Sequence, residues 1–393
     1  MSAKRQESEV LKQAVVLSSG TLDFRLELNE RLKEQWRDLT SSGPYAQPFY
    51  IPEWFQAFLS SFGDGYSSRL VVIKRDEKAV GILPLMKKRE FFGCIPAKTL
   101  ASLSGIHSCR FDMITDPTEV RRDVAGAAWR ELEQDRSWDV IEALDVPENG
   151  SFSEIAAAAR DAGYLTGEWP TRFSPILKLP KKGEDPMIYS PRGFRSFRKR
   201  LQTKLKSLGE LGLVSFDIEP HPYGKGLDQF MELEAAGWKG AKGGAIRSKP
   251  VTVKFYSKLV EQLQSRGLLR MYTLKVNDKP VSMQLGLYMN GVYYSPKAAY
   301  DEAFAKLAPG HLLVKYLLDD LVNNQASAYE FLGPRAFWKI IWTDAVVKHR
   351  NIYIFRPDLK GRALHALTMS AAAKARAIKY RWFGDPQEIK KGG

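Results

Sequence analysis

The stretch RMYTLKVNDKPVSMQLGLYMNGVYYSPKAAYDEAFAKLAPGHLLVKYLLDDLVNNQASAYEFL, residues 270–332, decides how this chain folds. Alternating apolar residues between Arg270 and Val276 predict a strand, and Asn277-Asp278 predicts a tight turn into a second strand. Asn290-Gly291 predicts another hairpin turn, and the apolar spacing after Pro309-Gly310 predicts a helix. The stretch therefore predicts three strands, a helix whose start attracts an anion, and a last strand.

An earlier segment repeats this hairpin. Residues 69–85 align with residues 270–286 at a constant offset, so that Arg69 meets Arg270 and Val80 meets Val281. Apolar spacing predicts helices over 22–39 and 52–62 before the first hairpin, and a strand, a helix and a strand after it. No glycine-bearing helix start matches Pro309-Gly310 in this half, so the anion site is expected only in the second.

The chain is too long, at 393 residues, for one ordinary core. The best boundary is the stretch 170–192, which is rich in Pro, Lys and Gly. We predict an α/β (α+β) fold: a tandem pair of lobes, each a mixed, mainly antiparallel sheet flanked by helices. The predicted parts are an N-terminal lobe over 20–170, a C-terminal lobe over 190–357 and a basic C-terminal tail over 358–393.

Composition narrows the class of protein. A content of 44% hydrophobic and 11% aromatic residues is typical of globular chains. The sequence starts without an apolar leader and has no apolar run of membrane-spanning length, so we predict a cytoplasmic protein. Cys94 and Cys109 have no Cys-x-x-Cys partner and no nearby histidine, which predicts buried thiols and no metal site. The net charge of +14 leaves nucleic acid, an anionic membrane surface or an acidic substrate open as partners.

Three basic segments each allow two interpretations. Residues 193–209 form an amphipathic pattern, typical either of a nucleic-acid or lipid surface or of a solvated helix at a domain junction. In the stretch 232–256, the glycine-rich, basic loop after Gly237 is either a flexible connection or a lid that clamps an anion. The alanine-rich tail 361–384 either lies at a membrane face or packs back on the second lobe.

Several short motifs together carry a family resemblance. They are Glu234-x-x-x-Trp238-Lys239-Gly240, Ala245-Ile246, Phe255-Tyr256, Lys297-x-x-Tyr300-Asp301, Pro309-Gly310-x-Leu312-Leu313, and Phe331-Leu332-Gly333 with Lys339 and Trp342. In this order, over residues 20–357, the chain resembles the two-lobed branch of the GCN5-related N-acetyltransferase (GNAT) superfamily. Within that branch it is similar to cellulose-biosynthesis-type acetyltransferases and, more distantly, to Fem-type transferases.

The resemblance implies acyl transfer from acetyl-coenzyme A or another acyl-coenzyme A bound in the second lobe. It also implies which residues hold the donor: the pantetheine arm lies along the second hairpin, and the pyrophosphate lies at the helix start. The corresponding residues are Met283, Gln284, Leu285, Pro309, Gly310, His311 and Leu312. The usual repeated glycines are replaced here by Ala308-Pro309-Gly310, and Fem-type relatives use aminoacyl-tRNA instead.

Acyl transfer needs a base for the nucleophile and an acid for the leaving thiolate. Glu234 is the first candidate base and Asp301 the second, while Tyr300 is the candidate acid. Asp301 also fits a helix cap and Tyr300 a core tyrosine. The candidate substrate-binding residues are Trp238, Lys239, Lys297, Glu330 and Lys339, although Glu330 equally suits a strand surface.

The sequence leaves three functional hypotheses. The first is an acyltransferase that modifies an amine or hydroxyl of a small molecule or saccharide, including an exopolysaccharide, with a possible peripheral membrane contact. The second is an aminoacyl-tRNA-dependent transferase, for which the basic helix at 193–209 would hold the RNA. The third is a non-catalytic module that binds an anionic polymer or a membrane surface.

Overall fold

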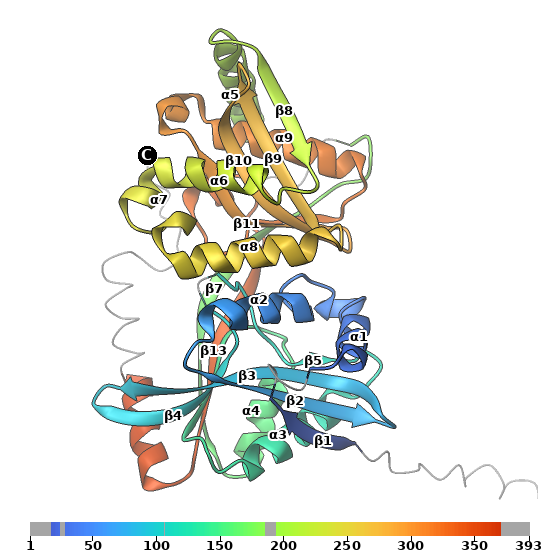
Figure 1. The fold of residues 1–393 in the computed structure, drawn as a ribbon, viewed down its shortest axis with the longest axis vertical. Coiled ribbons are helices and arrows are strands. Elements are labelled where there is room, and N and C mark those ends of the chain that lie inside the picture. Colours follow the sequence, from blue (N-terminus) through green and yellow to red (C-terminus); the bar gives the residue numbers. More distant parts are fainter. Residues whose placement is uncertain (1–16, 24–27, 106, 185–193, 371–393) are drawn as a thin grey trace, which may run out of the picture.

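A computed structural model describes residues 17–23, 28–105, 107–184 and 194–370, which form two lobes stacked along the long axis of the molecule (Figure 1). The N-terminal lobe comprises β1 (Ser18–Leu22), α1 (Glu30–Leu39), η1 (Gly43–Tyr45), α2 (Pro52–Phe62), β2 (Ser67–Arg75), β3 (Lys78–Phe92), β4 (Ile95–Ser102), β5 (Ile114–Thr115), α3 (Arg121–Gln134), β6 (Val140–Pro147), α4 (Phe152–Asp161) and β7 (Leu165–Lys178).

The rest of the chain builds the C-terminal lobe and then returns to the first. Its elements are α5 (Phe194–Gly209), β8 (Val214–Glu219), α6 (Lys225–Ala236), α7 (Trp238–Ala241), η2 (Ile246–Ser248), α8 (Pro250–Gln264), β9 (Leu269–Val276), β10 (Lys279–Met289), β11 (Val292–Tyr300), η3 (Glu302–Leu307), α9 (Pro309–Asn323), β12 (Ala328–Glu330), α10 (Phe337–Ile340) and β13 (Val346–Phe355). Residues 359–370 are helical. The predicted fold class, two lobes that each carry a mixed sheet flanked by helices, is confirmed.

One sheet runs through both lobes. The described strands follow the order β1-β2-β3-β4-β6-β13-β7-β12-β11-β10-β9-β8, with β5 paired to β3. Strand β7 makes the connection, because its first part pairs with β13 and its last three residues pair with β12. Strand β13 lies between β6 and β7, so the last strand of the chain completes the sheet of the first lobe.

The hairpin repeat is confirmed in its backbone geometry. The β2–β3 turn holds Asp76 and Glu77 at φ of 47° and 65°, and the β9–β10 turn holds Asn277 and Asp278 at 49° and 64°. Paired left-handed residues are typical of the tight turns whose twist matches that of the strands. A bulge also recurs, since the register skips Val80 in β3 and the equivalent Val281 in β10.

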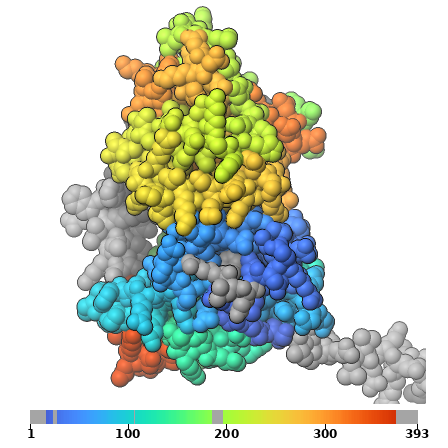
Figure 2. Space-filling model, viewed as in Figure 1, coloured from blue at the N-terminus to red at the C-terminus, as the bar shows by residue number. Residues whose placement is uncertain are grey.

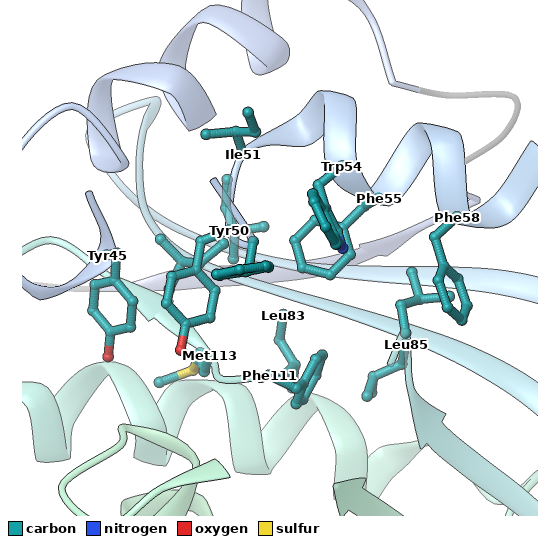
Figure 3. Close-up of a cluster of buried hydrophobic side chains, with 14 of the residues drawn as sticks. Tyr45, Tyr50, Ile51, Trp54, Phe55, Phe58, Leu83, Leu85, Phe111 and Met113 are labelled. Atoms are coloured by element: carbon teal, nitrogen blue, oxygen red, sulfur yellow. The ribbon is translucent and has the colours of Figure 1, made fainter. Parts of the chain in front are cut away.

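Aromatic side chains fill the core of the N-terminal lobe and extend it into the second lobe. Residues of α2 and the preceding loop, including Tyr50, Trp54 and Phe58, lie in one buried cluster with Leu83 of β3 and Phe111 (Figure 3). Helix α8 of the second lobe lies directly against α2, as the contact between the gold and blue surfaces in Figure 2 shows. This buried contact fixes one lobe on the other.

A buried ion pair adds a polar connection between the lobes. Arg110 follows β4 in the first lobe, Glu330 ends β12 in the second, and each side chain is 3% exposed. The Arg110 guanidinium donates to a Glu330 carboxylate oxygen and also to Gln47. Because ions are costly to bury, each charge depends on the other.

Three local predictions change. The helix expected over 22–39 is a strand up to Leu22 and a helix from Glu30, because Asn29 caps the helix by accepting from the Leu32 N–H. The glycine-rich stretch after Gly237 contains the short helices α7 and η2. The described part of the tail packs on the first lobe: Leu364 is fully buried and Met369 fills the space above Gly167 of β7.

Candidate active site

A cavity of about 1070 Å³ lies between the lobes. The C-terminal lobe lines it with parts of β10 and β11, the first turn of α9 and the segment 331–339. The N-terminal lobe contributes Cys109 and parts of β6, β7 and β13. Both lobes therefore build one site, and its volume suits a sizeable ligand.

The cavity begins where two neighbouring strands separate. Strands β11 and β12 run parallel and pair only from Val292 to Tyr294. A bulge at Ser295 and Pro296 follows, after which β11 keeps its pairing with β10 but has no β12 partner. The unpaired side of β11 thus offers backbone groups to an extended ligand in the cavity, as an added strand would use them.

Helix α9 starts at the edge of this gap. Ala308 precedes it in the left-handed conformation, with φ of 53°, and no side chain caps the helix. Pro309 has no N–H, and the N–H groups of His311 and Leu312 both donate to the Ala308 carbonyl. Among the described residues the Gly310 N–H has no hydrogen-bond partner, so it is the donor that this helix start presents.

His311 adds a second donor beside the helix start. The Trp342 indole N–H donates to His311 Nδ1 at 3.1 Å, which places the proton of the neutral imidazole on Nε2. Burial lowers the pKa of His311 to about 4, so the ring is neutral at physiological pH. Within the cavity His311 is therefore a neutral hydrogen-bond donor rather than a cation.

Lys339 is the buried cation of the cavity. Its side chain is 8% exposed, and its ammonium donates to the carbonyls of Leu332 and Pro334. No carboxylate in the described part of the chain forms an ion pair with it. Burial lowers the pKa of Lys339 to about 8. A lysine in this state carries its charge at neutral pH and can release a proton readily.

The first candidate base, Glu234, lies outside the cavity. Its side chain is fully buried on α6, where Oε1 accepts from Lys239 at 3.1 Å and from Lys297 at 3.3 Å. Oε2 accepts from the Ile246 N–H at 2.8 Å. Glu234 thus holds two lysines, of which Lys239 lines the cavity and also donates to the Ala298 carbonyl at 2.7 Å.

Of the other candidate residues for the chemical step and for substrate binding, some line the cavity and others do not. Tyr300 lines the cavity beside the first turn of α9, where its ring lies 4.0 Å from a Cβ built on Gly310. Asp301 caps η3 by accepting from Ala303 N–H, and it pairs with Lys279 at 2.9 Å, which holds the pKa of Asp301 below its usual value. Trp238 lines the cavity and is 51% exposed.

The expected donor-binding residues divide between the cavity and the core. Gln284, Pro309, Gly310 and His311 line the cavity, whereas Met283, Leu285 and Leu312 lie in the hydrophobic core. Glu330 is engaged in the buried ion pair with Arg110, and Lys297 packs over the ring of Tyr256. The first lobe, by contrast, supplies cavity residues that the sequence did not indicate: Cys109, Asp145, Thr171, Arg172 and Asn351.

Two kinds of feature are absent from the described residues. They contain no helix that is long and apolar enough to cross a membrane. They also contain no group of three or more His, Cys, Asp or Glu side chains placed to hold a metal ion.

Comparison with known proteins agrees with this architecture. None of the curated proteins matches the chain. Among solved structures, FemX is 11% identical with a TM-score of 0.56, covering 86% of this chain and 97% of its own. The C-terminal domain of a protein described as a lysylphosphatidylglycerol synthetase, from Agrobacterium fabrum, is 10% identical with a TM-score of 0.50, covering 92% and 100%. At these identities the likeness concerns the fold.

The sequence itself also carries a family signature. The acetyltransferase (GNAT) domain family matches residues 195–340, the stretch from α5 to α10 that contains the separated strands and the first turn of α9. Residues 195–340 therefore carry the signature of an acetyltransferase (GNAT) domain, and the chain is similar in fold to FemX.

Proposed function

We propose that this protein transfers an acyl group from acyl-coenzyme A to an amine or hydroxyl of a small molecule or saccharide. The observation that carries the proposal is the cavity itself, which joins the unpaired side of β11 to an uncapped helix start and a buried lysine. The GNAT domain match supports acyl transfer in general. Ligand titration and acceptor assays test the identities of the donor and the acceptor.

The donor would lie along β11. Ser295, Pro296 and residues 298–300 line the cavity on the side that β12 leaves free, which suits the amide groups of a pantetheine arm. The phosphates would then reach the start of α9, where the Gly310 N–H and the helix dipole favour an anion. The space beside the Gly310 Cα is open, since a methyl group there would meet nothing closer than 4.0 Å.

Lys339 and Tyr300 would serve the chemical step. The Lys339 ammonium is buried and positively charged at neutral pH, so it can stabilise negative charge that develops on the thioester carbonyl oxygen. Tyr300 has a hydroxyl in the same cavity and can protonate the leaving thiolate. Glu234 would act indirectly, since it fixes Lys239 at the cavity wall.

The direct test is isothermal titration with acetyl-coenzyme A. The intact protein should bind with a dissociation constant in the micromolar range, and Gly310→Asp should abolish the heat because it places a carboxylate at the phosphate site. Gly310→Ala is the matched control, because the added methyl group fits the open space. No heat from the unaltered protein at millimolar ligand would reject the coenzyme A donor.

One observation favours aminoacyl-tRNA as a second candidate donor. Phe197 of α5 packs on His311 and Trp342 with ring centroids 5.2 Å apart in each case, which brings this basic helix next to the donor end of the cavity. Lys199, Arg200 and Lys206 of α5 are exposed. If tRNA is the donor, its affinity should fall steeply with salt, and Lys199→Glu with Lys206→Glu should flatten that dependence.

A further inference from the structure

The wall that the first lobe contributes to the cavity contains one carboxylate, Asp145. Every other charged residue described at the cavity surface is a cation: Arg172, Lys239 and Lys339. Asp145 is 6% exposed and burial raises the pKa of its carboxyl group. A single carboxylate among cations, on the part of the wall that the first lobe supplies, calls for a specific ligand or a specific structural role.

The backbone around Asp145 is bent so that this residue reaches the cavity. Both strands that flank β13 bulge near this point. In β6, Leu144 and Asp145 together oppose Asn351 of β13, and in β7, Thr171 and Arg172 together oppose His349 of β13. Asp145 has φ of 56°, a conformation that few non-glycine residues adopt. Bulges re-aim side chains, and strain of this kind is often stored at functional sites.

The carboxylate is held but not saturated. Oδ1 accepts from the Thr171 hydroxyl at 3.0 Å, and Oδ2 pairs with Arg172 at 3.0 Å. The Asn351 amide oxygen accepts from the Asp145 N–H at 3.0 Å and so fixes the bulge. Each carboxylate oxygen has two lone pairs, so both oxygens retain the capacity to accept another hydrogen bond.

We infer that Asp145 binds the amino group of the acceptor, so that the acceptor is a primary amine and the transfer is to nitrogen. This inference rests on the proposed acyl transfer in the same cavity. An ammonium group would enter against the Asp145 carboxylate and lose one proton through it to solvent. The amine nitrogen then forms a bond to the thioester carbonyl carbon, and the carbon–sulfur bond breaks. The thiolate takes a proton from Tyr300, and the second proton lost by the nitrogen restores the Tyr300 hydroxyl, so that the products are the amide and the free thiol.

Asp145→Asn is a suitable variant because asparagine tolerates positive φ and has nearly the same shape. The matched control is Asp278→Asn, which makes the same change at a similar φ of 64° in the β9–β10 turn, away from the cavity. Both variants would be assayed as full chains by chromatographic measurement of coenzyme A released from acetyl-coenzyme A. The acceptor probes are glucosamine and ethanolamine, with glucose and ethylene glycol as their hydroxyl counterparts.

We expect the amines to be acetylated and their hydroxyl counterparts not. Asp145→Asn should raise the KM for the amine roughly 10- to 100-fold, the range of a hydrogen bond to a charged group. Its acetyl-coenzyme A affinity and the kinetics of Asp278→Asn should be unchanged. In the unaltered protein the KM should rise as pH falls through the raised pKa of Asp145, because a protonated carboxyl does not attract an ammonium, and Asp145→Asn should lose this dependence.

An unchanged KM in Asp145→Asn, or equal use of hydroxyl acceptors, would overturn the inference while leaving coenzyme A binding intact. If acetyl-coenzyme A itself gives no heat, the donor proposal has failed, and glucosamine binding is then measured directly by saturation-transfer NMR. Binding that Asp145→Asn removes would still support the amine site. Equal binding by both proteins, or no amine binding at all, would reject it.

Discussion

The two lobes share a framework but differ in the segment after their fourth strand. In the first lobe β4 and β6 pair in parallel from Thr99 to Ala101 and then separate, as β11 and β12 do in the second. In the first lobe the chain itself closes the gap: the Ser102 hydroxyl accepts from the Leu144 N–H, and Phe111 N–H donates to the Asp145 carbonyl. In the second lobe the equivalent gap opens into the cavity.

The helix starts do not make this difference, because α3 and α9, which occupy the same place in their lobes, both start without a side-chain cap. In the first lobe the segment after β4 is instead tied down by Asp112, whose carboxylate accepts from the N–H groups of Ser151 and Phe152 at the start of α4. The difference teaches that a repeat can keep its strands, turns and bulges while a short connecting segment decides which copy binds a ligand. The first lobe instead supplies a wall to the site of the second.

The largest effect is expected from breaking the link between the lobes. Arg110→Met or Glu330→Gln should lower the free energy of unfolding by about 3–5 kcal/mol, because each leaves a buried partner without its ion pair. Urea unfolding followed by circular dichroism measures this loss. Asp161→Asn, which removes an exposed pair with Arg122, is the control. A loss below about 1 kcal/mol, the size of an exposed pair, would show that this contact does not hold the lobes together.

A smaller effect, on activity rather than stability, should distinguish two lysines, one in each lobe: the half-buried Lys88 and the buried Lys339. Lys88 in β3 has Glu142 and Glu90 as ion partners, whereas Lys339 has only backbone carbonyls. Lys339→Met should lower kcat/KM roughly 100-fold, in the range measured for lost transition-state hydrogen-bond donors. Lys88→Met should leave kcat/KM within about threefold, a change below 1 kcal/mol. Equal kcat/KM values for the two variants would remove Lys339 from the mechanism.

Lys339 and Lys88 also have pKa values that are shifted in opposite directions, which predicts a pH dependence for Lys339. Burial lowers the pKa of Lys339 to about 8, whereas at Lys88 the carboxylates outweigh burial and raise the pKa. If the charged form of Lys339 stabilises the transition state, kcat should fall as pH rises through about 8. The free energy of unfolding should change in the opposite direction. The folded protein releases the Lys339 proton more easily than the unfolded chain, whose lysine pKa is near 10.4, so the folded state gains stability as pH rises from about 8 to about 10.4. A rate that rises through pH 8 would make Lys339 a base instead.

The smallest effect concerns the two matched turns. Glu77 and Asp278 occupy equivalent left-handed positions, which aspartate tolerates better than glutamate. Glu77→Gly should therefore stabilise the protein by roughly 0.5–1 kcal/mol, and Asp278→Gly by less, since glycine adopts positive φ without steric cost. Thermal unfolding of the two variants side by side measures the difference. A larger gain at Asp278 would contradict the equivalence of the turns.

Local patterns predicted much of this fold. The hairpins, α9 and the GNAT-like order follow from turn residues such as Asn290-Gly291 and from apolar spacing, which act over short distances along the chain. The cap at Asn29 was a signal of the same kind that would have placed the first helix correctly. Four residues that the sequence indicated also line the cavity, because they lie in or beside those elements: Gly310, His311, Tyr300 and Lys339.

The remaining parts depend on contacts between distant segments. Glu234 is the first candidate base from the sequence, because partial burial near Trp238 can tune a carboxylate. Nothing near it in the sequence shows that Lys297, far along the chain in β11, pairs with it. Asp145 and Asn351 meet only because β13 inserts beside β6, a pairing that leaves no periodic signal in the sequence. Side-chain pairing across a sheet and the path of a returning strand are both properties of the assembled structure.

The position of β13 has a consequence for synthesis of the protein. Until the ribosome has released residues 346–355, β6 and β7 have no strand between them, so each exposes an open backbone edge to the cell. The N-terminal lobe therefore cannot complete its sheet as an independent unit during translation, although domains commonly do so in order. A nascent chain that ends before β13 lacks Asn351, and therefore also lacks the hydrogen bond by which Asn351 fixes the bulge at Asp145. The site is thereby restricted to chains whose translation has passed β13.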